Sequence, residues 1–99
     1  MDSFFNSIKE AAQIFFKIQT PIRVISHLDA DGLSSAAIMV KTLKRMDKKF
    51  ILSIVKQIST QLLAELKKES YEAYVFLDTG SGNIADINKN LKNRIIFIL

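Results

Sequence analysis

The chain changes from a strand pattern to a helix pattern within one segment, Arg23-Val-Ile-Ser-His-Leu-Asp-Ala-Asp-Gly-Leu-Ser-Ser35. The β-branched run that begins after Pro21 predicts a short buried strand over residues 22–26. We expect Gly32 to supply a turn, after which apolar residues follow helical spacing at Leu33, Ala36, Ala37, Val40 and Leu43. Three ionisable side chains therefore lie between the predicted strand and the predicted helix: His27, Asp29 and Asp31. In an open α/β sheet, ligands bind at that edge.

The bulk composition indicates one small domain over residues 1–99, with 48% hydrophobic residues. No apolar run approaches the length of a membrane span, and the N-terminus mixes polar with apolar residues, unlike a signal peptide. The chain has no cysteine, which excludes a disulfide framework and a thiolate metal site and favours a cytoplasmic protein. The net charge of +4 is compatible with a polyanionic partner but is too mild to indicate one.

The remaining apolar runs alternate between helix and strand spacing. The expected helices cover 3–18 (capped by Asp2 or Ser3), 33–47, a short segment after Ser59 or Thr60, and a segment that Asn83 can cap; the expected strands are 22–26, 50–55, 74–77 and 95–99. This alternation predicts an α/β fold, with a parallel sheet of about four strands and helices on both faces. Because natural domains rarely end on an uncapped apolar strand, we expect the chain to be the N-terminal piece of something longer.

Carboxylates follow two of the predicted strands. Asp29 and Asp31 come after the first strand and Asp78 after the third, so all three converge if those strands are neighbours. Clustered carboxylates repel one another, and a divalent cation removes the conflict. Oxygen ligands with an imidazole from His27 suit Mn²⁺ or Mg²⁺. Gly80 and Ser81 would then place backbone N–H groups beside the metal, as a phosphate-binding turn.

Simpler interpretations stay open for each feature. Asp31-Gly32 can be a helix N-cap and turn, and a lone histidine is more often structural than a ligand. The basic stripe late in the second helix is a solvated face or a nucleic-acid contact; it consists of Lys41, Lys44, Arg45 and Lys48.

Three known motifs share parts of this pattern. An EF-hand register would put Ile38 where a bidentate glutamate is required, which excludes a calcium loop. Asp78-Thr-Gly-Ser81 matches the aspartic-protease signature, but those enzymes are all-β and this pattern is not. Asp29-x-Asp31 resembles the first motif of haloacid-dehalogenase-type phosphatases, which is the strongest enzymatic alternative.

Taken together, Ser26-His-Leu-Asp-Ala-Asp-Gly-Leu-Ser-Ser-Ala36 and Phe76-Leu-Asp-Thr-Gly-Ser81 resemble the DHH phosphoesterase family, most closely the archaeal RecJ-like single-strand nucleases. The resemblance covers essentially the whole chain. It implies the N-terminal half of a DHH (Rossmann-like) domain that hydrolyses phosphodiesters with two Mn²⁺ or Mg²⁺ ions. On the same basis Asp29 and Asp31 divide between the two metals, Asp78 bridges them, and His27 is a further ligand.

The family's Asp-His-His motif and its C-terminal substrate-binding domain are not in this sequence. We therefore expect these 99 residues alone to have little or no nuclease activity. The resemblance implies single-stranded nucleic acid or short oligonucleotides as substrate. The alternative is a non-catalytic replication scaffold of RecJ-like type that partners GINS-type proteins; retention of all three aspartates favours the enzyme.

Overall fold

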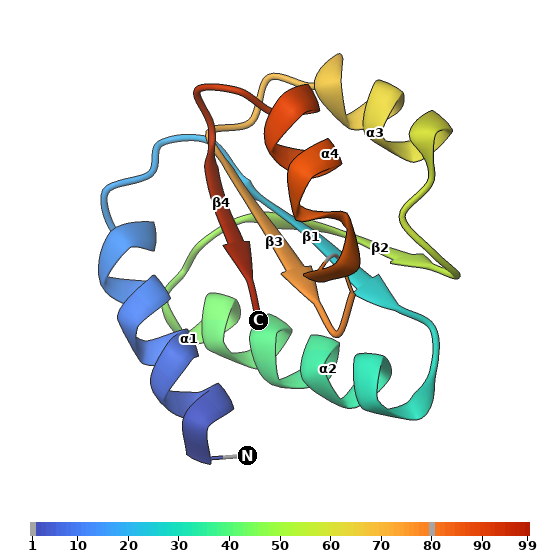
Figure 1. Ribbon diagram of the computed structural model, residues 1–99. Helices are drawn as coiled ribbons and strands as arrows, with labels where there is room; N and C mark the ends of the chain where they lie inside the picture. Colours follow the sequence, from blue (N-terminus) through green and yellow to red (C-terminus); the bar gives the residue numbers. More distant parts are fainter. Residues whose placement is uncertain (1, 80) are drawn as a thin grey trace.

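The computed structural model describes residues 2–79 and 81–99, without the side chains of Asp2, Phe4, Phe5, Ile8 and Ser81. The elements are α1 (Asp2–Phe15), β1 (Ile22–His27), α2 (Ala30–Arg45), β2 (Phe50–Val55), α3 (Thr60–Lys67), β3 (Ala73–Leu77), a 3₁₀ turn (Ser81–Asn83), α4 (Ile84–Asn90) and β4 (Ile95–Ile98). The predicted alternation of helices and strands is confirmed (Figure 1). None of the helices that the structure describes is both long enough and apolar enough to cross a membrane.

The four strands form one parallel sheet in the order β2-β1-β3-β4. Ile25 of β1 lies opposite Phe76 of β3, which in turn lies opposite Ile98 of β4. All four strands therefore point their carboxyl ends toward the same edge of the sheet. The neighbouring positions of β1 and β3 meet the condition under which the sequence predicted convergent carboxylates.

Helices cover both faces of the sheet, as predicted, two on each (Figure 1). Alternate residues of β1 pack in opposite directions: Val24 joins the core beneath α1 and α2, and Ile25 joins the core beneath α3 and α4. Every residue of β3 is buried. The apolar sequence of β3 fits a central parallel strand, and β1 is likewise buried from Ile22 to Ser26, although it includes Arg23 and Ser26.

The buried face of α2 differs from the prediction. The helix begins at Ala30, three positions before the expected start, and buries Gly32, Ala36, Met39 and Leu43. Leu33 is 50% exposed and Ala37 is also exposed. Helical periodicity gives the spacing of a buried face, whereas the short connection from β1 fixes which residues turn toward the sheet.

The predicted caps are confirmed only in part. Ser59 caps α3 through its hydroxyl, which accepts a hydrogen bond from the Leu62 N–H at 3.0 Å. Asn83 occupies the cap position of α4, but its side chain makes no capping bond. Ser3 lies inside α1, and the side chain of Asp2 is outside the described residues.

The basic stripe of α2 is not uniform. The ammonium of Lys48 donates hydrogen bonds to the carbonyl oxygens of Phe16 and Ile18 at 3.2 and 3.0 Å. Lys48 therefore ties the chain that follows α1 to the end of α2. Lys41, Lys44 and Arg45 remain exposed on the helix surface.

Candidate metal site

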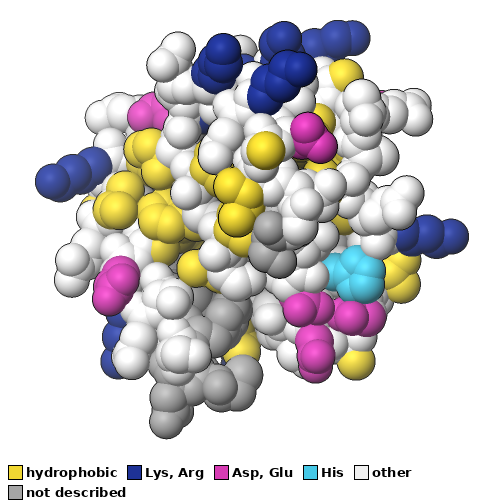
Figure 2. Space-filling model, in the orientation of Figure 1, with side chains coloured by type: hydrophobic (Ala, Val, Ile, Leu, Met, Phe, Trp, Pro, Cys, Tyr) yellow, Lys and Arg dark blue, Asp and Glu magenta, His cyan; other side chains and the backbone are white. Residues whose placement is uncertain are grey.

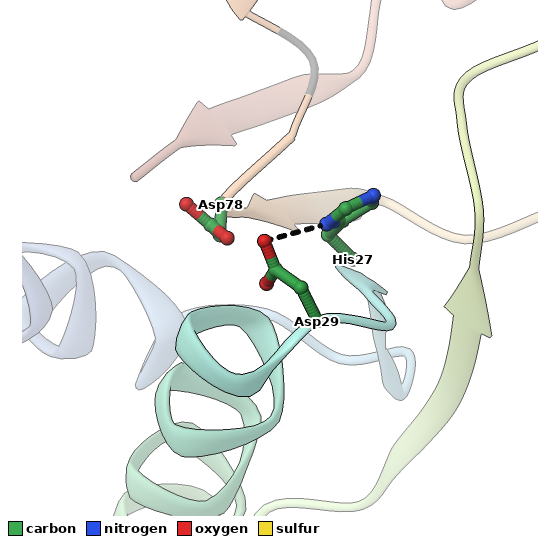
Figure 3. Close-up of side chains that lie close together, drawn as sticks. All are labelled: His27, Asp29 and Asp78. Atoms are coloured by element: carbon green, nitrogen blue, oxygen red, sulfur yellow. Dashed lines mark ion pairs between the residues drawn. The ribbon is translucent and has the colours of Figure 1, made fainter.

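Three of the predicted site residues meet at the carboxyl edge of the sheet. His27 ends β1, Asp29 begins the connection into α2, and Asp78 follows β3 directly. One potential ligand atom from each residue lies within 4.8 Å of the other two. Figure 3 shows the two carboxylates and the imidazole pointing toward one another from the ends of two neighbouring strands.

Asp29 is held in place from two sides. Its Oδ1 accepts a hydrogen bond from the Gly32 N–H at 2.8 Å, which makes Asp29 the N-cap of α2. Its Oδ2 lies 3.1 Å from Nδ1 of His27, an ion pair when the imidazole is protonated (dashed in Figure 3). The simpler alternative in which Asp31 caps the helix is excluded, because α2 starts earlier and Asp31 lies in its first turn.

Gly32 has a different role from the one predicted. It is buried inside the first turn of α2 and does not form a turn before the helix. A Cβ atom at position 32 would overlap the carbonyl oxygen of His27 and stand 2.7 Å from its carbonyl carbon. Glycine is therefore required because the helix approaches the end of β1 so closely.

Ser26 stabilises the same close approach of α2 to the end of β1. Its role was not predicted from the sequence. Its fully buried hydroxyl donates a hydrogen bond to the carbonyl oxygen of Gly32 at 2.7 Å and lies 3.4 Å from that of Leu77. One side chain thus joins the ends of β1 and β3 to the start of α2. A serine at the buried end of a strand, directly before His27, was the only signal for this role.

The backbone of Asp78 adopts a left-handed conformation, with φ of 54°. Its N–H donates a hydrogen bond to the carbonyl oxygen of Leu99 at 3.1 Å, beyond the end of β4. Aspartate and asparagine tolerate this conformation better than most other residues with a side chain. The sharp change of direction turns the Asp78 carboxylate toward Asp29 as the strand ends.

The two carboxyl groups affect each other's protonation in opposite directions. The hydrogen bond from the Gly32 N–H is the main cause that lowers the pKa of Asp29, helped by Asp78 and His27. The pKa of Asp78 is raised, chiefly by its hydrogen bond with Asp29, then by desolvation and the negative charges of Asp29 and Asp31. As pH falls, Asp78 therefore takes up a proton before Asp29 does.

The structure does not bring every predicted residue into this group. Asp31 is exposed in the first turn of α2 and lies outside the three-residue group, although its charge acts on Asp78. Gly80 and the side chain of Ser81 lie outside the described residues, so the predicted phosphate-binding turn stays a prediction.

The donor set suits a hard divalent cation. It offers two carboxylates and one imidazole, and the described residues place no lysine or arginine side chain in an ion pair with either carboxylate. A cation would relieve the repulsion between Asp29 and Asp78. Oxygen-rich sets of this kind suit Mn²⁺ or Mg²⁺, and the imidazole is more favourable to Mn²⁺.

No family model matches the chain. In an alignment of 78 residues that covers 76% of the chain, it is 44% identical to a protein of Methanocaldococcus jannaschii named "Uncharacterized protein MJ0831". The chain spans 18% of the length of that relative, whose name states no activity.

Proposed function

We propose that this chain is part of a DHH-type, RecJ-like phosphodiesterase that hydrolyses single-stranded nucleic acid or short oligonucleotides with two Mn²⁺ or Mg²⁺ ions. The observation that carries the proposal is the convergence of His27, Asp29 and Asp78 at the ends of neighbouring parallel strands. The sequence motifs that resemble the family contain these same three residues.

The protein's own side chains would hold and orient the ions. Asp29 is fixed by the Gly32 N–H, so one carboxylate is already aligned before a cation arrives. Asp78 would supply a second carboxylate to the ions, from the end of the neighbouring strand. Asp31, exposed in the first turn of α2, is the candidate ligand of the second ion.

Bound divalent cations would supply Lewis-acid activation of a water molecule and charge neutralisation of the phosphodiester. The imidazole of His27 lies beside Asp29 at the rim of the site, where it can orient that carboxylate. The site is partly open, so a polymeric substrate can approach it without a closed pocket.

The test is a cleavage assay on the protein expressed from its complete reading frame, with end-labelled single-stranded DNA and RNA in Mn²⁺ or Mg²⁺. Wild-type protein should cleave. Asp78→Asn should lose at least about a hundredfold in rate, since removal of one catalytic electrostatic group costs this much or more. Asp86→Asn removes an equivalent aspartate from the first turn of α4 and should cleave normally.

Other outcomes separate the alternatives. Mn²⁺ binding without any hydrolysis would contradict the enzyme and favour the scaffold. If the protein hydrolyses p-nitrophenyl phosphate but leaves the oligonucleotides uncleaved, a phosphatase of haloacid-dehalogenase type is favoured.

A further inference from the structure

A second charged feature lies at the opposite edge of the sheet from the carboxylates. Because α3 and α4 run antiparallel to the strands, their last turns lie near the amino ends of β1 and β3. A depression of about 450 Å³ there is lined by five residues: Lys67, Lys89, Asn90, Lys92 and Arg94. We refer to these residues as the basic pocket. Figure 2 shows Lys and Arg side chains gathered over this end of the molecule, while the His and several acidic side chains gather at the other end.

The lining offers hydrogen-bond donors and positive charge but no carboxylate. Four of its five residues are cationic, and the fifth is an amide. In the part of the chain that the structure describes, the ammonium groups of Lys67, Lys89 and Lys92 form neither ion pairs nor hydrogen bonds. Three adjacent like charges without counter-ions repel one another, so an anionic ligand would stabilise this arrangement.

The simplest alternative is that these cations only compensate the carbonyl groups at the ends of the helices. At α3 that role is already filled by Arg94. Its guanidinium donates hydrogen bonds to the carbonyl oxygens of Leu66 and Lys67 at 2.9 and 2.7 Å. The lysines are therefore not needed to cap α3 and remain available to a ligand.

Arg94 also gives the pocket a rigid side. It donates a third hydrogen bond to the hydroxyl of Tyr74 at 2.8 Å, and its guanidinium lies 5.3 Å from the centre of the Tyr74 ring. A guanidinium has five N–H donors, so two remain after these three bonds. A fixed guanidinium beside exposed ammonium groups is well suited to phosphate, which accepts several charge-assisted hydrogen bonds at once.

We propose that the basic pocket binds a phosphate-bearing ligand, held by Lys67, Lys89, Lys92 and the free donors of Arg94. Its volume lies in the range of small-molecule sites, roughly 300–1000 Å³. The ligand is either a small phosphate compound or successive phosphates of a polynucleotide. The inference rests on the charges of this pocket and does not depend on the carboxylate site or on the proposed hydrolysis.

Binding of pyrophosphate and of a fluorescent oligothymidylate is measured with the wild-type chain in EDTA, which removes any contribution from metal ions. The test variant is Lys89→Gln/Lys92→Gln. The matched control is Lys41→Gln/Lys44→Gln, which removes the same charge from exposed positions of α2 on the other face of the sheet. Circular dichroism and thermal melting establish that both variants fold like the wild type.

We expect wild type and control to bind, and the test variant to lose about tenfold or more in affinity. For the oligonucleotide, two lost phosphate contacts should reduce the slope of log affinity against log salt by about 1.4. If the test variant loses affinity for both probes, the pocket is a polynucleotide site. If it loses affinity for pyrophosphate alone, the pocket is a site for small phosphate compounds. Failure of the wild type to bind either probe, or equal losses in test variant and control, would overturn the proposal.

Discussion

Gly32 lies so close to His27 that a Cβ atom on it would overlap the carbonyl oxygen of His27. The same glycine donates its N–H to the carboxylate of Asp29 at 2.8 Å. One residue without a side chain therefore lets α2 approach the end of β1 and also fixes a carboxylate of the candidate site. The packing of the sheet edge and the geometry of the site share this contact.

Gly32→Ala should destabilise the protein by about 3 kcal/mol, because the added methyl group meets backbone atoms that cannot rotate away. Urea unfolding measures the change in the free energy of unfolding. The matched control is Gly82→Ala, where nothing lies within 4 Å of the new Cβ atom, and we expect a change within about 0.5 kcal/mol. Equal effects of the two substitutions would show that α2 does not approach β1 as described.

Ser26→Ala should lower the free energy of unfolding by about 1 kcal/mol, since it removes the buried hydrogen bond from Ser26 to the carbonyl oxygen of Gly32. Ser7→Ala is the matched control, because Ser7 also donates to a backbone carbonyl, that of Ser3, but on the exposed surface of α1. The control should change the free energy of unfolding by less than about 0.5 kcal/mol. A Ser26→Ala protein as stable as the control would mean that this hydroxyl does not lock the strand ends.

The fold was largely predictable from local patterns. Strand-forming runs separated by helical periodicity predicted the parallel α/β sheet, and Ser59 correctly marked the start of α3. The convergence of Asp29 and Asp78 was predictable only under the condition that β1 and β3 are neighbours, because local sequence does not determine strand order.

The sequence prediction failed where tertiary contacts determine which way a residue faces. Leu33 was placed in the core by its spacing, yet the short link from β1 rotates α2 so that Gly32 faces the sheet. Asp31 stands two residues beyond Asp29 in the first turn of α2 and lies outside the three-residue group, which spacing in the sequence did not indicate. The role of Ser26 depends on a carbonyl six residues away, which no periodicity predicts.

Asp78→Asn should change how the stability of the metal-free protein depends on pH. The raised pKa of Asp78 means that the folded state holds this proton more tightly than the unfolded state, whose value is near 3.8. Its contribution to stability is present below that value and is lost as pH rises through the raised pKa. The asparagine amide can donate to Asp29 at every pH and tolerates the left-handed backbone, so this loss should disappear.

Thermal melting in EDTA, at intervals from acid to neutral pH, tests this expectation. The melting temperature of Asp78→Asn relative to wild type should rise as pH increases. The effect should be modest, because both carboxyls are exposed and are screened by water and salt. Asp86→Asn provides the comparison: its melting temperature should differ from that of the wild type by nearly the same amount at every pH. Parallel curves for Asp78→Asn and wild type would contradict a raised pKa of Asp78 in the folded state.

The central claim is that Asp29, Asp78 and His27 form one cation site, and calorimetric titration with Mn²⁺ tests it most directly. Wild-type chain should bind Mn²⁺, Asp78→Asn should bind at least about tenfold more weakly, and Asp86→Asn should match the wild type. The expected loss is at least as large as the 10–100-fold that follows removal of groups that only orient a ligand. Equal Mn²⁺ affinity in wild type and Asp78→Asn would contradict the shared site.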